Sequence, residues 1–531
     1  MASTTFDFAS WPPALSDTQL ETLTVYATSY ALSHGLLYLP PTTSGRQPMV
    51  PSSAIHAPIS LFPAPFPRKL FDQGRRIQKA YNILYARIAM DEEFLDRIMG
   101  AEEGVGKVDD FIGQLWRGWK KLRDVGLVQP LQFGLFRSDY LLHAPANEPL
   151  SIKQVEFNTI SVSFGCLSQK VAELHRYLLS ATNYYETSPF LKRENFPAND
   201  NITGLANGLA EAHKAYGVPG SQILFVVQTG ERNVFDQRPL EYELLEKHSI
   251  HIIRQTFDEL AHTASLDPST SVLKVSVPKD IHPSGHVEIS TVYYRAGYMP
   301  YDYATPADYA TRFLLEESRA IKCPSIALQL AGGKKVQEVL TQPGMLERFL
   351  GDEEKYGKDG VLSHEEIEDL RKSFMGMWGL DVAEDMLTPN VDAVKAGREE
   401  FGVRKAREAA LSLVLKPQRE GGGNNVYKEA IPAFLDSLPP QERQAWIAME
   451  LIKSPEDTGN YLVRAGTESQ APVKAEVISE LGIFGWALFG GPTKEVKEEE
   501  VGWLVRTKSK DSNEGGVATG FSVLDSLLLV D

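Results

Sequence analysis

Hydrophobic and polar positions along the chain predict a mixed α/β protein. In FDQGRRIQKAYNILYARIAM (71–90), apolar residues recur every three or four positions, which is the spacing of an amphipathic helix. Residues 54–127 are therefore predicted to be mostly helical. In IKQVEFNTISVSFG (152–165) apolar and polar residues alternate, and VAELHRYLLS (171–180) follows with helical spacing. These two segments predict a strand that leads directly into a helix.

From residue 221 onward, short runs of β-branched and aromatic residues alternate with helical stretches. The runs are SQILFVVQ (221–228), HIIRQTF (251–257), VLKVSV (272–277) and STVYYRAGY (290–298). RPLEYELLEKH (238–248) is a predicted helix between the first two runs. This alternation is typical of an α/β unit with parallel strands. We expect a separate domain over residues 216–331, between segments 1–215 and 332–531.

Net charge and cysteine content limit the partners and the compartment. The 531-residue chain has a formal charge of −16. Such an acidic chain lacks the basic face that nucleic acid or an anionic membrane would require, so an anionic ligand needs a local basic pocket. The two cysteines, Cys166 and Cys323, lie in mostly apolar contexts and are predicted to be buried free thiols. With no signal-peptide pattern at the start, the sequence predicts a cytoplasmic protein.

One glycine run suggests a phosphate site. Lys416 ends an apolar run, and Glu420 and three glycines follow it in KPQREGGGNN (416–425). Neither the phosphate-loop pattern nor the dinucleotide fingerprint is present. A lysine and bare backbone amides suit a flap over a polyphosphate, and Glu420 and Asn425 offer oxygen atoms to Mg²⁺. A glycine-rich surface turn is the alternative.

Charged residues in other predicted strands favour the phosphate interpretation. Glu450 lies in the apolar run IAMELI, Glu480 in ISELGIFG, and Arg506 and Lys508 end WLVRTKSK. Each of them alone could mark a solvated strand end. Acids on successive strands, together with lysines beside a glycine run, have the chemistry to bind ATP phosphates and two Mg²⁺ ions.

Seven separated blocks of sequence, in the same order, resemble the eukaryotic-type glutathione synthetases. The blocks are VEFNTISVSFG, ERNVFDQR, YYRAGYMP, CPSIALQLAGGKKVQ, LKPQREGGGNN, ISELGIFG, and LVRTK followed by EGGVATG, and together they span about residues 130–520. The resemblance implies an ATP-grasp fold with an inserted α/β substrate-binding domain and a glycine-rich lid. It also implies a homodimer that joins γ-glutamylcysteine to glycine and releases ADP and phosphate.

The resemblance implies specific site residues. It places the metal ligands on Glu156, Asn158 and Glu420. It places the nucleotide site on Glu156, Lys334, Lys416, Glu420, Gly421, Gly422, Gly423, Asn424, Asn425, Tyr427, Met449, Glu450, Leu451, Ile452, Glu480, Lys508 and Glu514. It places the peptide-substrate site on Arg137, Ile160, Ser161, Val162, Ser163, Glu231, Arg232, Asn233, Gln237, Arg295, Ala296, Gly297, Tyr298, Arg506, Val517 and Ala518. Ala296 stands where many relatives have an aspartate, so a side-chain carboxylate is missing there.

The chemistry implied by the resemblance is carboxylate activation by ATP through an acyl phosphate. Such a reaction needs positioned cations and no side-chain nucleophile, and we expect Arg137, Lys334, Lys416 and Arg506 to supply the catalytic charge. Three alternatives remain open at this point. The acceptor could be alanine or serine, as in homoglutathione-type synthetases, the chain could be an inactive ATP-binding regulatory homologue, or it could be a small-molecule kinase.

Overall fold

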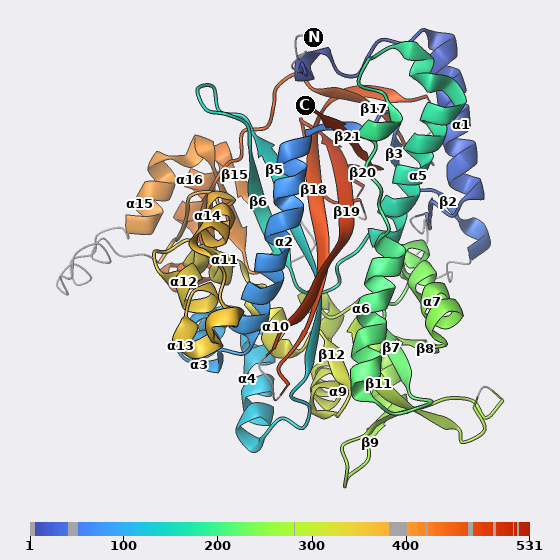
Figure 1. Ribbon diagram of the computed structural model, residues 1–531. Coiled ribbons are helices and arrows are strands. Elements are labelled where there is room, and N and C mark those ends of the chain that lie inside the picture. The colour runs from blue at the N-terminus through green and yellow to red at the C-terminus, as the bar shows by residue number, and fades with distance from the viewer. Residues whose placement is uncertain are drawn as a thin grey trace.

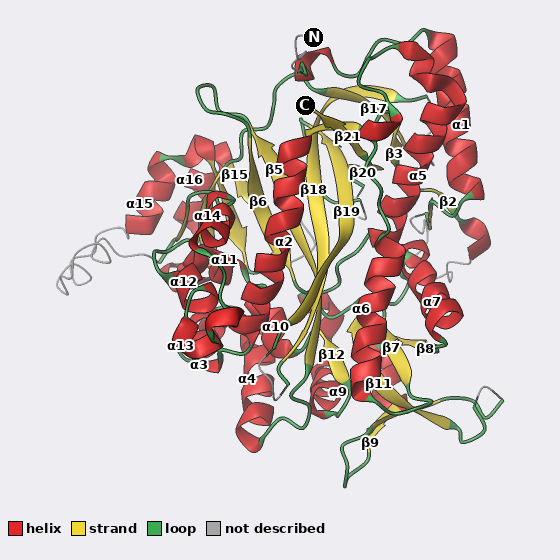
Figure 2. Ribbon diagram, in the orientation of Figure 1, coloured by secondary structure: helices red, strands yellow, loops and turns green. Residues whose placement is uncertain are grey.

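The computed structural model shows a mixed α/β protein in which helices flank several β-sheets (Figures 1 and 2). The structure describes residues 6–40, 51–280, 282–381, 401–419, 423–465, 471–491, 495–512, 515–517 and 520–531. None of the helices in these ranges is long and apolar enough to cross a membrane.

A seven-stranded sheet forms the centre of the described structure, with the strand order β17-β3-β20-β19-β18-β5-β6. Its strands are β3 (Ile59–Ser60), β5 (Gln132–His143), β6 (Ser151–Asn158), β17 (Gly459–Val463), β18 (Val473–Phe489), β19 (Lys497–Ser509) and β20 (Ser522–Asp525). The long central strands β5, β18 and β19 pair antiparallel. Helix α2 (Arg68–Ala89) lies across this sheet (Figure 1) and buries Ile77, Tyr81, Leu84 and Ile88, which the helical repeat brings to one face.

A second sheet, ordered β8-β7-β11-β10-β9 with β12 also paired to β11, lies beside helices α6 (Asn201–Tyr216) and α7 (Val234–His248) (Figure 1). Its strands are β7 (Gln222–Val226), β8 (Ile252–Gln255), β9 (Ala264–Leu266), β10 (Leu273–Ser276), β11 (His286–Tyr294) and β12 (Ile321–Cys323). Strands β7, β8, β11 and β12 are parallel, whereas β9 and β10 are antiparallel.

A four-stranded sheet, ordered β13-β16-β14-β15, carries the segments on either side of the glycine run. Its strands are β13 (Met377–Gly379), β14 (Leu413–Pro417), β15 (Val426–Tyr427) and β16 (Trp446–Glu450). Helices α15 (Phe401–Glu408) and α16 (Ile431–Ser437) belong to the same small hydrophobic core as Leu415 and Trp378. Two further pairs are β1 (Leu37–Tyr38) with β2 (Ile55–His56), and β4 (Ala64–Pro67) with β21 (Leu527–Val530).

The remaining α-helices surround these sheets. They are α1 (Asp17–Ser33), α3 (Glu92–Met99), α4 (Asp110–Val125), α5 (Gly165–Thr182), α8 (Phe257–Thr263), α9 (Pro306–Glu317), α10 (Ile326–Ala331), α11 (Lys334–Leu340), α12 (Met345–Leu350), α13 (Glu353–Tyr356) and α14 (His364–Lys372). Helix α1 begins at a capping box, because Ser16 and Gln19 satisfy each other's backbone N–H groups.

Two expectations from the sequence differ from the structure. Residues 54–67 form short strands rather than helix, because prolines at 63, 65 and 67 remove backbone donors and disfavour helical geometry. In the second sheet, VLKVSV forms an antiparallel strand, since the connection from β10 to β11 is shorter than the dozen or so residues that a parallel crossover needs. The predicted strand-to-helix step is confirmed as β6 followed by α5, and both cysteines are buried and free.

Candidate functional site

A cavity of about 1330 Å³ brings together most of the predicted site residues. Its walls come from β5, β6, β14, β16, β18 and β19, and from the segments that follow β6 and β7. The predicted residues that line it are Arg137, Glu156, Asn158, Ile160, Ser161, Val162, Ser163, Glu231, Arg232, Asn233, Arg295, Tyr298, Lys334, Lys416, Asn424, Asn425, Tyr427, Met449, Glu450, Leu451, Ile452, Glu480, Arg506, Lys508 and Val517.

The other predicted residues fall into two groups. Gln237, Ala296, Gly297 and Gly423 are described but are not among the residues that line the cavity. Position 296 is a buried alanine, and an alanine offers a ligand no polar side-chain group. The predictions on Glu420, Gly421, Gly422, Glu514 and Ala518 lie outside the described residues.

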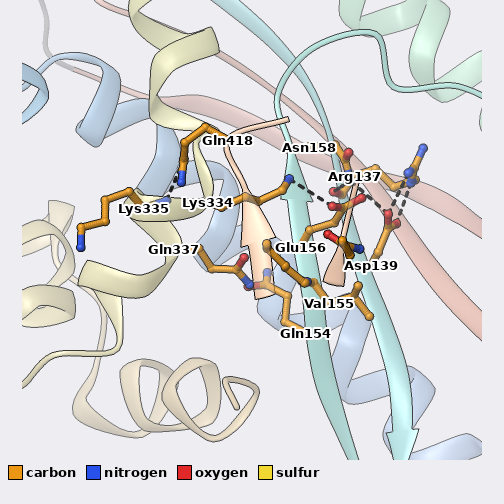
Figure 3. Close-up of polar contacts among 12 residues, drawn as sticks. Arg137, Asp139, Gln154, Val155, Glu156, Asn158, Lys334, Lys335, Gln337 and Gln418 are labelled. Carbon is orange, nitrogen blue, oxygen red and sulfur yellow. Dashed lines mark hydrogen bonds and ion pairs between the residues drawn. The ribbon is translucent and has the colours of Figure 1, made fainter. Parts of the chain in front are cut away.

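Cations surround one carboxylate in the cavity, that of Glu156. Glu156 projects from β6 toward Lys334, and the Lys334 Nζ lies 3.1 Å from its Oε2 (Figure 3). Lys416, on β14, donates from Nζ to the Val155 carbonyl at 2.7 Å. Burial by itself raises the pKa of Glu156, but Lys334, Lys416 and Arg506 outweigh burial and hold that pKa well below its usual value. The carboxylate is therefore ionised at neutral pH.

Gly332, two residues before Lys334, allows this approach. A side chain at Gly332 would place its Cβ 2.4 Å from the Thr159 Oγ1, so only glycine lets the start of α11 pack against the segment that follows β6. The Lys334 side chain is consequently buried close to Glu156.

The strand β16 and its continuation form another wall. Met449 pairs with Val414 of β14 and with Met377 of β13, and it is buried. The Leu451 backbone N–H donates to the Ser412 carbonyl at 2.8 Å. An apolar wall with fixed backbone groups is the surface that a planar heterocyclic base requires.

Two arginines and two acids form a cluster in the same cavity. Arg137, on β5, donates from Nε and Nη2 to the two oxygens of Asp139, at 2.6 and 2.7 Å. Arg506, on β19, donates from Nη2 to Asp139 at 3.0 Å and also to Glu480. Burial lowers the pKa of Arg506, but the carboxylates of Glu480 and Asp139 outweigh it and raise that pKa, so this arginine stays charged.

Glu231 and its neighbours form another polar group at the cavity. Glu231 accepts from the Asn233 backbone N–H at 2.7 Å and from the Gln237 Nε2 at 2.6 Å. Gln237 therefore orients Glu231 without lining the cavity. The buried Asn233 Oδ1 and Arg295 Nε have no hydrogen-bond partner among the described residues, which is unusual for buried polar atoms.

The segment between β6 and α5 is held in an unusual conformation. Ser161 and Phe164 have positive φ angles of 52° and 68°. Asp236, at the start of α7, accepts from the backbone N–H groups of Phe164 and Cys166 at 2.6 and 3.0 Å, and of Leu167 at 3.3 Å. This buried carboxylate therefore satisfies the first turn of α5 and fixes the predicted substrate segment.

Asp139 and Asp236 were missed by reasoning from the sequence. A signal existed for Asp139, because Arg137 and Asp139 are two positions apart in an apolar strand and so share one face. No local signal existed for Asp236, whose acceptor role depends on residues about 70 positions earlier in the chain.

Comparisons with known proteins match this chain to glutathione synthetases over nearly its whole length. The family profile described as "Eukaryotic glutathione synthase, ATP binding domain" matches residues 17–529. Similar curated proteins include a mouse glutathione synthetase, 36% identical over 97% of this chain and 98% of that protein. A large chain of glutathione synthetase from Schizosaccharomyces pombe is also 36% identical, over 96% of this chain and 98% of that protein.

A solved structure shares the fold. It is a glutathione synthetase-like effector from Globodera pallida in its apo form, with a TM-score of 0.71 and 24% identity. The match covers 97% of this chain and 98% of the effector chain.

Proposed function

This chain belongs to the eukaryotic glutathione synthase family and is an ATP-dependent glutathione synthase, and we propose that it joins γ-glutamylcysteine to glycine within the cavity described above. The observation that carries the proposal is the convergence of Lys334, Lys416 and Lys508 with Arg137 and Arg506 in one cavity. These cations come from four separate segments of an acidic chain. A local basic pocket of this kind is what a nucleotide and a carboxylate substrate need.

The proposed architecture is an ATP-grasp fold with an inserted α/β substrate-binding domain at 216–331 and a glycine-rich lid. The flanking segments, 1–215 and 332–531, would form the body. Support comes from the second sheet, which spans β7 to β12, and from the position of β14 and β15 on either side of the glycine run.

ATP would bind with its phosphates near Lys334, Lys416 and Lys508 and with its base against β16. The γ-phosphoryl group passes to the cysteinyl carboxylate of the peptide, which gives an acyl phosphate and ADP. The glycine amine then attacks the acyl carbon, and phosphate leaves. The described residues act by position and charge, because this route requires no side-chain nucleophile.

Mg²⁺ fits the oxygen donors on β6. Glu156 and Asn158 are two positions apart on one strand face, and both line the cavity. Among the described residues no group of three His, Cys, Asp or Glu side chains could hold a metal, and Glu420, the third proposed ligand, lies outside them. We propose that two Mg²⁺ ions bind here, and when bound they would neutralise phosphate charge.

The peptide substrate would lie between the arginine cluster and Glu231. Arg506 offers a planar fork to a substrate carboxylate, and Arg137 would meet the negative charge that develops at the acyl centre. Arg295, whose buried Nε has no hydrogen-bond partner in the described part of the chain, also lines the cavity and would lie near the γ-glutamyl group. An acyl phosphate hydrolyses in water, so the proposed lid, with the segment around Val517, would exclude solvent before transfer.

The experiment that tests this function is ADP and phosphate release by the purified protein with ATP, Mg²⁺ and γ-glutamylcysteine. We expect release to depend on glycine and to produce the tripeptide. Parallel reactions with alanine or serine would identify a homoglutathione-type enzyme. ATP binding without turnover for every acceptor would instead indicate a regulatory homologue, and a stable phosphorylated peptide would indicate a kinase.

We also infer a cytoplasmic homodimer. The test for the assembly is a light-scattering mass, which should be twice the mass of the chain.

A further inference from the structure

Asp139 has more charged and polar partners than any role in the proposed mechanism explains. It is fully buried in β5 and accepts four hydrogen bonds through its two oxygens. Two come from Arg137, one from Arg506 at 3.0 Å and one from the Asn158 Nδ2 at 3.0 Å. Figure 3 shows the carboxylate between the Arg137 side chain and the residues of β6.

This carboxylate determines where both guanidinium groups point. Arg137 and Arg506 lie on different strands and would repel each other in a cavity that is partly shielded from water. A shared carboxylate removes that repulsion, and its bidentate contact with Arg137 holds the planar group in one orientation. Because a carboxylate only accepts hydrogen bonds, it also requires the NH₂ group of Asn158 to face it.

A glycine on the neighbouring strand makes room for the arrangement. Gly482, on β18, is the Cα partner of Asp139. A Cβ atom at position 482 would lie 2.9 Å from the Arg137 Cδ and 2.9 Å from the Asp139 Oδ1. Such contacts are closer than carbon and oxygen atoms tolerate, so a side chain there would displace the Arg137–Asp139 pair.

We propose that Asp139 is the positioning residue that directs Arg137 and Arg506 toward the carboxylate of the peptide substrate. This inference rests on the proposed function, since it assumes that the peptide binds in this cavity. It assigns Asp139 no contact with substrate. Its effect passes through the two arginines, so it should appear in carboxylate recognition and should leave nucleotide binding intact.

The test compares binding of γ-glutamylcysteine with binding of its C-terminal amide, in the absence of ATP. The wild-type protein should bind the acid at least about tenfold more tightly, since hydrogen bonds from the two arginines to a charged carboxylate are lost in the amide. In D139N the acid should bind only about as tightly as the amide. Affinity for ATP measured without Mg²⁺ should change by less than about threefold, because Lys334 and Lys416 keep their contacts with β6.

A second variant disturbs the pair without changing its charge. G482A should also abolish the preference for the acid, since its new methyl group displaces the Arg137–Asp139 pair. Its matched control is G485A, on the same strand, where the added Cβ would crowd Asn82 instead, at 2.6 Å from its Oδ1. We expect G485A to retain the full preference for the acid. G482A therefore tests the proposal even if D139N does not fold.

A control for the charge change is D525N, compared with D139N at pH 8, where this other fully buried acid of the same sheet is ionised. It should leave the preference for the acid unchanged. The positioning role is overturned if D139N and G482A weaken the acid and the amide equally, because that result describes general damage. Failure of the proposed function is distinguishable, since wild-type protein would then show no glycine-dependent turnover at all.

Discussion

At the scale of single residues, charge is concentrated around Glu156. Its pKa is depressed because Lys334 forms an ion pair with it and Lys416 and Arg506 lie close by. The ionised carboxylate in turn makes it possible to bury Lys334, which would otherwise lose its hydration without compensation. The group therefore holds a negatively charged oxygen atom, which we propose as an Mg²⁺ ligand, among several cations.

Replacement of this carboxylate should change the metal requirement. E156Q keeps the size of the side chain but removes the charge that would attract Mg²⁺. We expect the Mg²⁺ concentration for half-maximal turnover to rise by at least about tenfold, as when support for a metal site is lost. The measurement is a magnesium titration at saturating ATP. An unchanged titration would remove Glu156 from the proposed ligands.

Asp525 provides a pH-dependent contribution to stability. Its burial in β20 raises its pKa to about 7, although Thr507 donates to it at 2.7 Å and opposes that rise. Between pH 3.8, the ordinary pKa of the group, and about pH 7, the folded protein therefore keeps a proton that the unfolded chain has released. Stability from this group is present at low pH and is lost as the pH rises toward 7.

The variant D525N should lack this dependence. Between pH 5 and pH 8, the wild type should lose about 3 kcal/mol more unfolding free energy than D525N, at about 1.4 kcal/mol per pH unit from pH 5 to about 7. Urea unfolding of both proteins at the two pH values measures the difference. Parallel losses in the two proteins would show that Asp525 does not titrate in this range.

At the scale of elements, helix α5 is attached to the site through one residue of α7. Asp236 accepts from three backbone N–H groups at the α5 N-terminus and faces Arg295, whose Nη2 lies 3.5 Å away. A helix start that is buried needs such an acceptor, because its first N–H groups have no partner within the helix. The positions of residues 160–164 thus depend on packing between two helices.

Loss of the Asp236 charge should affect both stability and peptide binding. D236N leaves Arg295 without its buried partner and puts an amide donor near backbone donors, which should cost about 3 kcal/mol of unfolding free energy. The KM for γ-glutamylcysteine should rise more than the KM for ATP. Steady-state kinetics with each substrate varied separately would reveal this difference, and an equal rise in both KM values would contradict it.

At the scale of the whole molecule, the candidate site depends on the joint placement of several sheets. Lys416 and Met449 come from the four-stranded sheet, Glu156 and Arg506 from the seven-stranded sheet, and Arg295 from the end of a strand in the second sheet. A ligand that spans the cavity contacts all three. Its binding energy is therefore available only when the whole arrangement is folded.

Substrates together should stabilise the protein more than either one alone. A ligand at 100 times its dissociation constant contributes about 2.7 kcal/mol to the folded state. We expect ADP with Mg²⁺ and γ-glutamylcysteine each to raise the melting temperature, and the pair to raise it further. Thermal melts with each ligand and with both measure this effect. No added shift from the pair would argue against one shared cavity.

Much of the local structure and most of the candidate site could be predicted from the sequence. Hydrophobic periodicity identified the helix of α2 and the step from β6 to α5, because both follow from side-chain spacing along one segment. The resemblance gives no contacts or distances, yet it identified residues such as Lys334 and Lys416, which line one cavity in the structure.

Only the tertiary structure decided which distant groups meet. Arg506 reaches Asp139 across 367 positions, and Asp236 reaches Phe164 across 72. The antiparallel direction of β10 likewise depends on pairing with β11. A sequence by itself determines residue chemistry and local spacing, whereas partners far apart in the chain are selected by how complete sheets and helices pack.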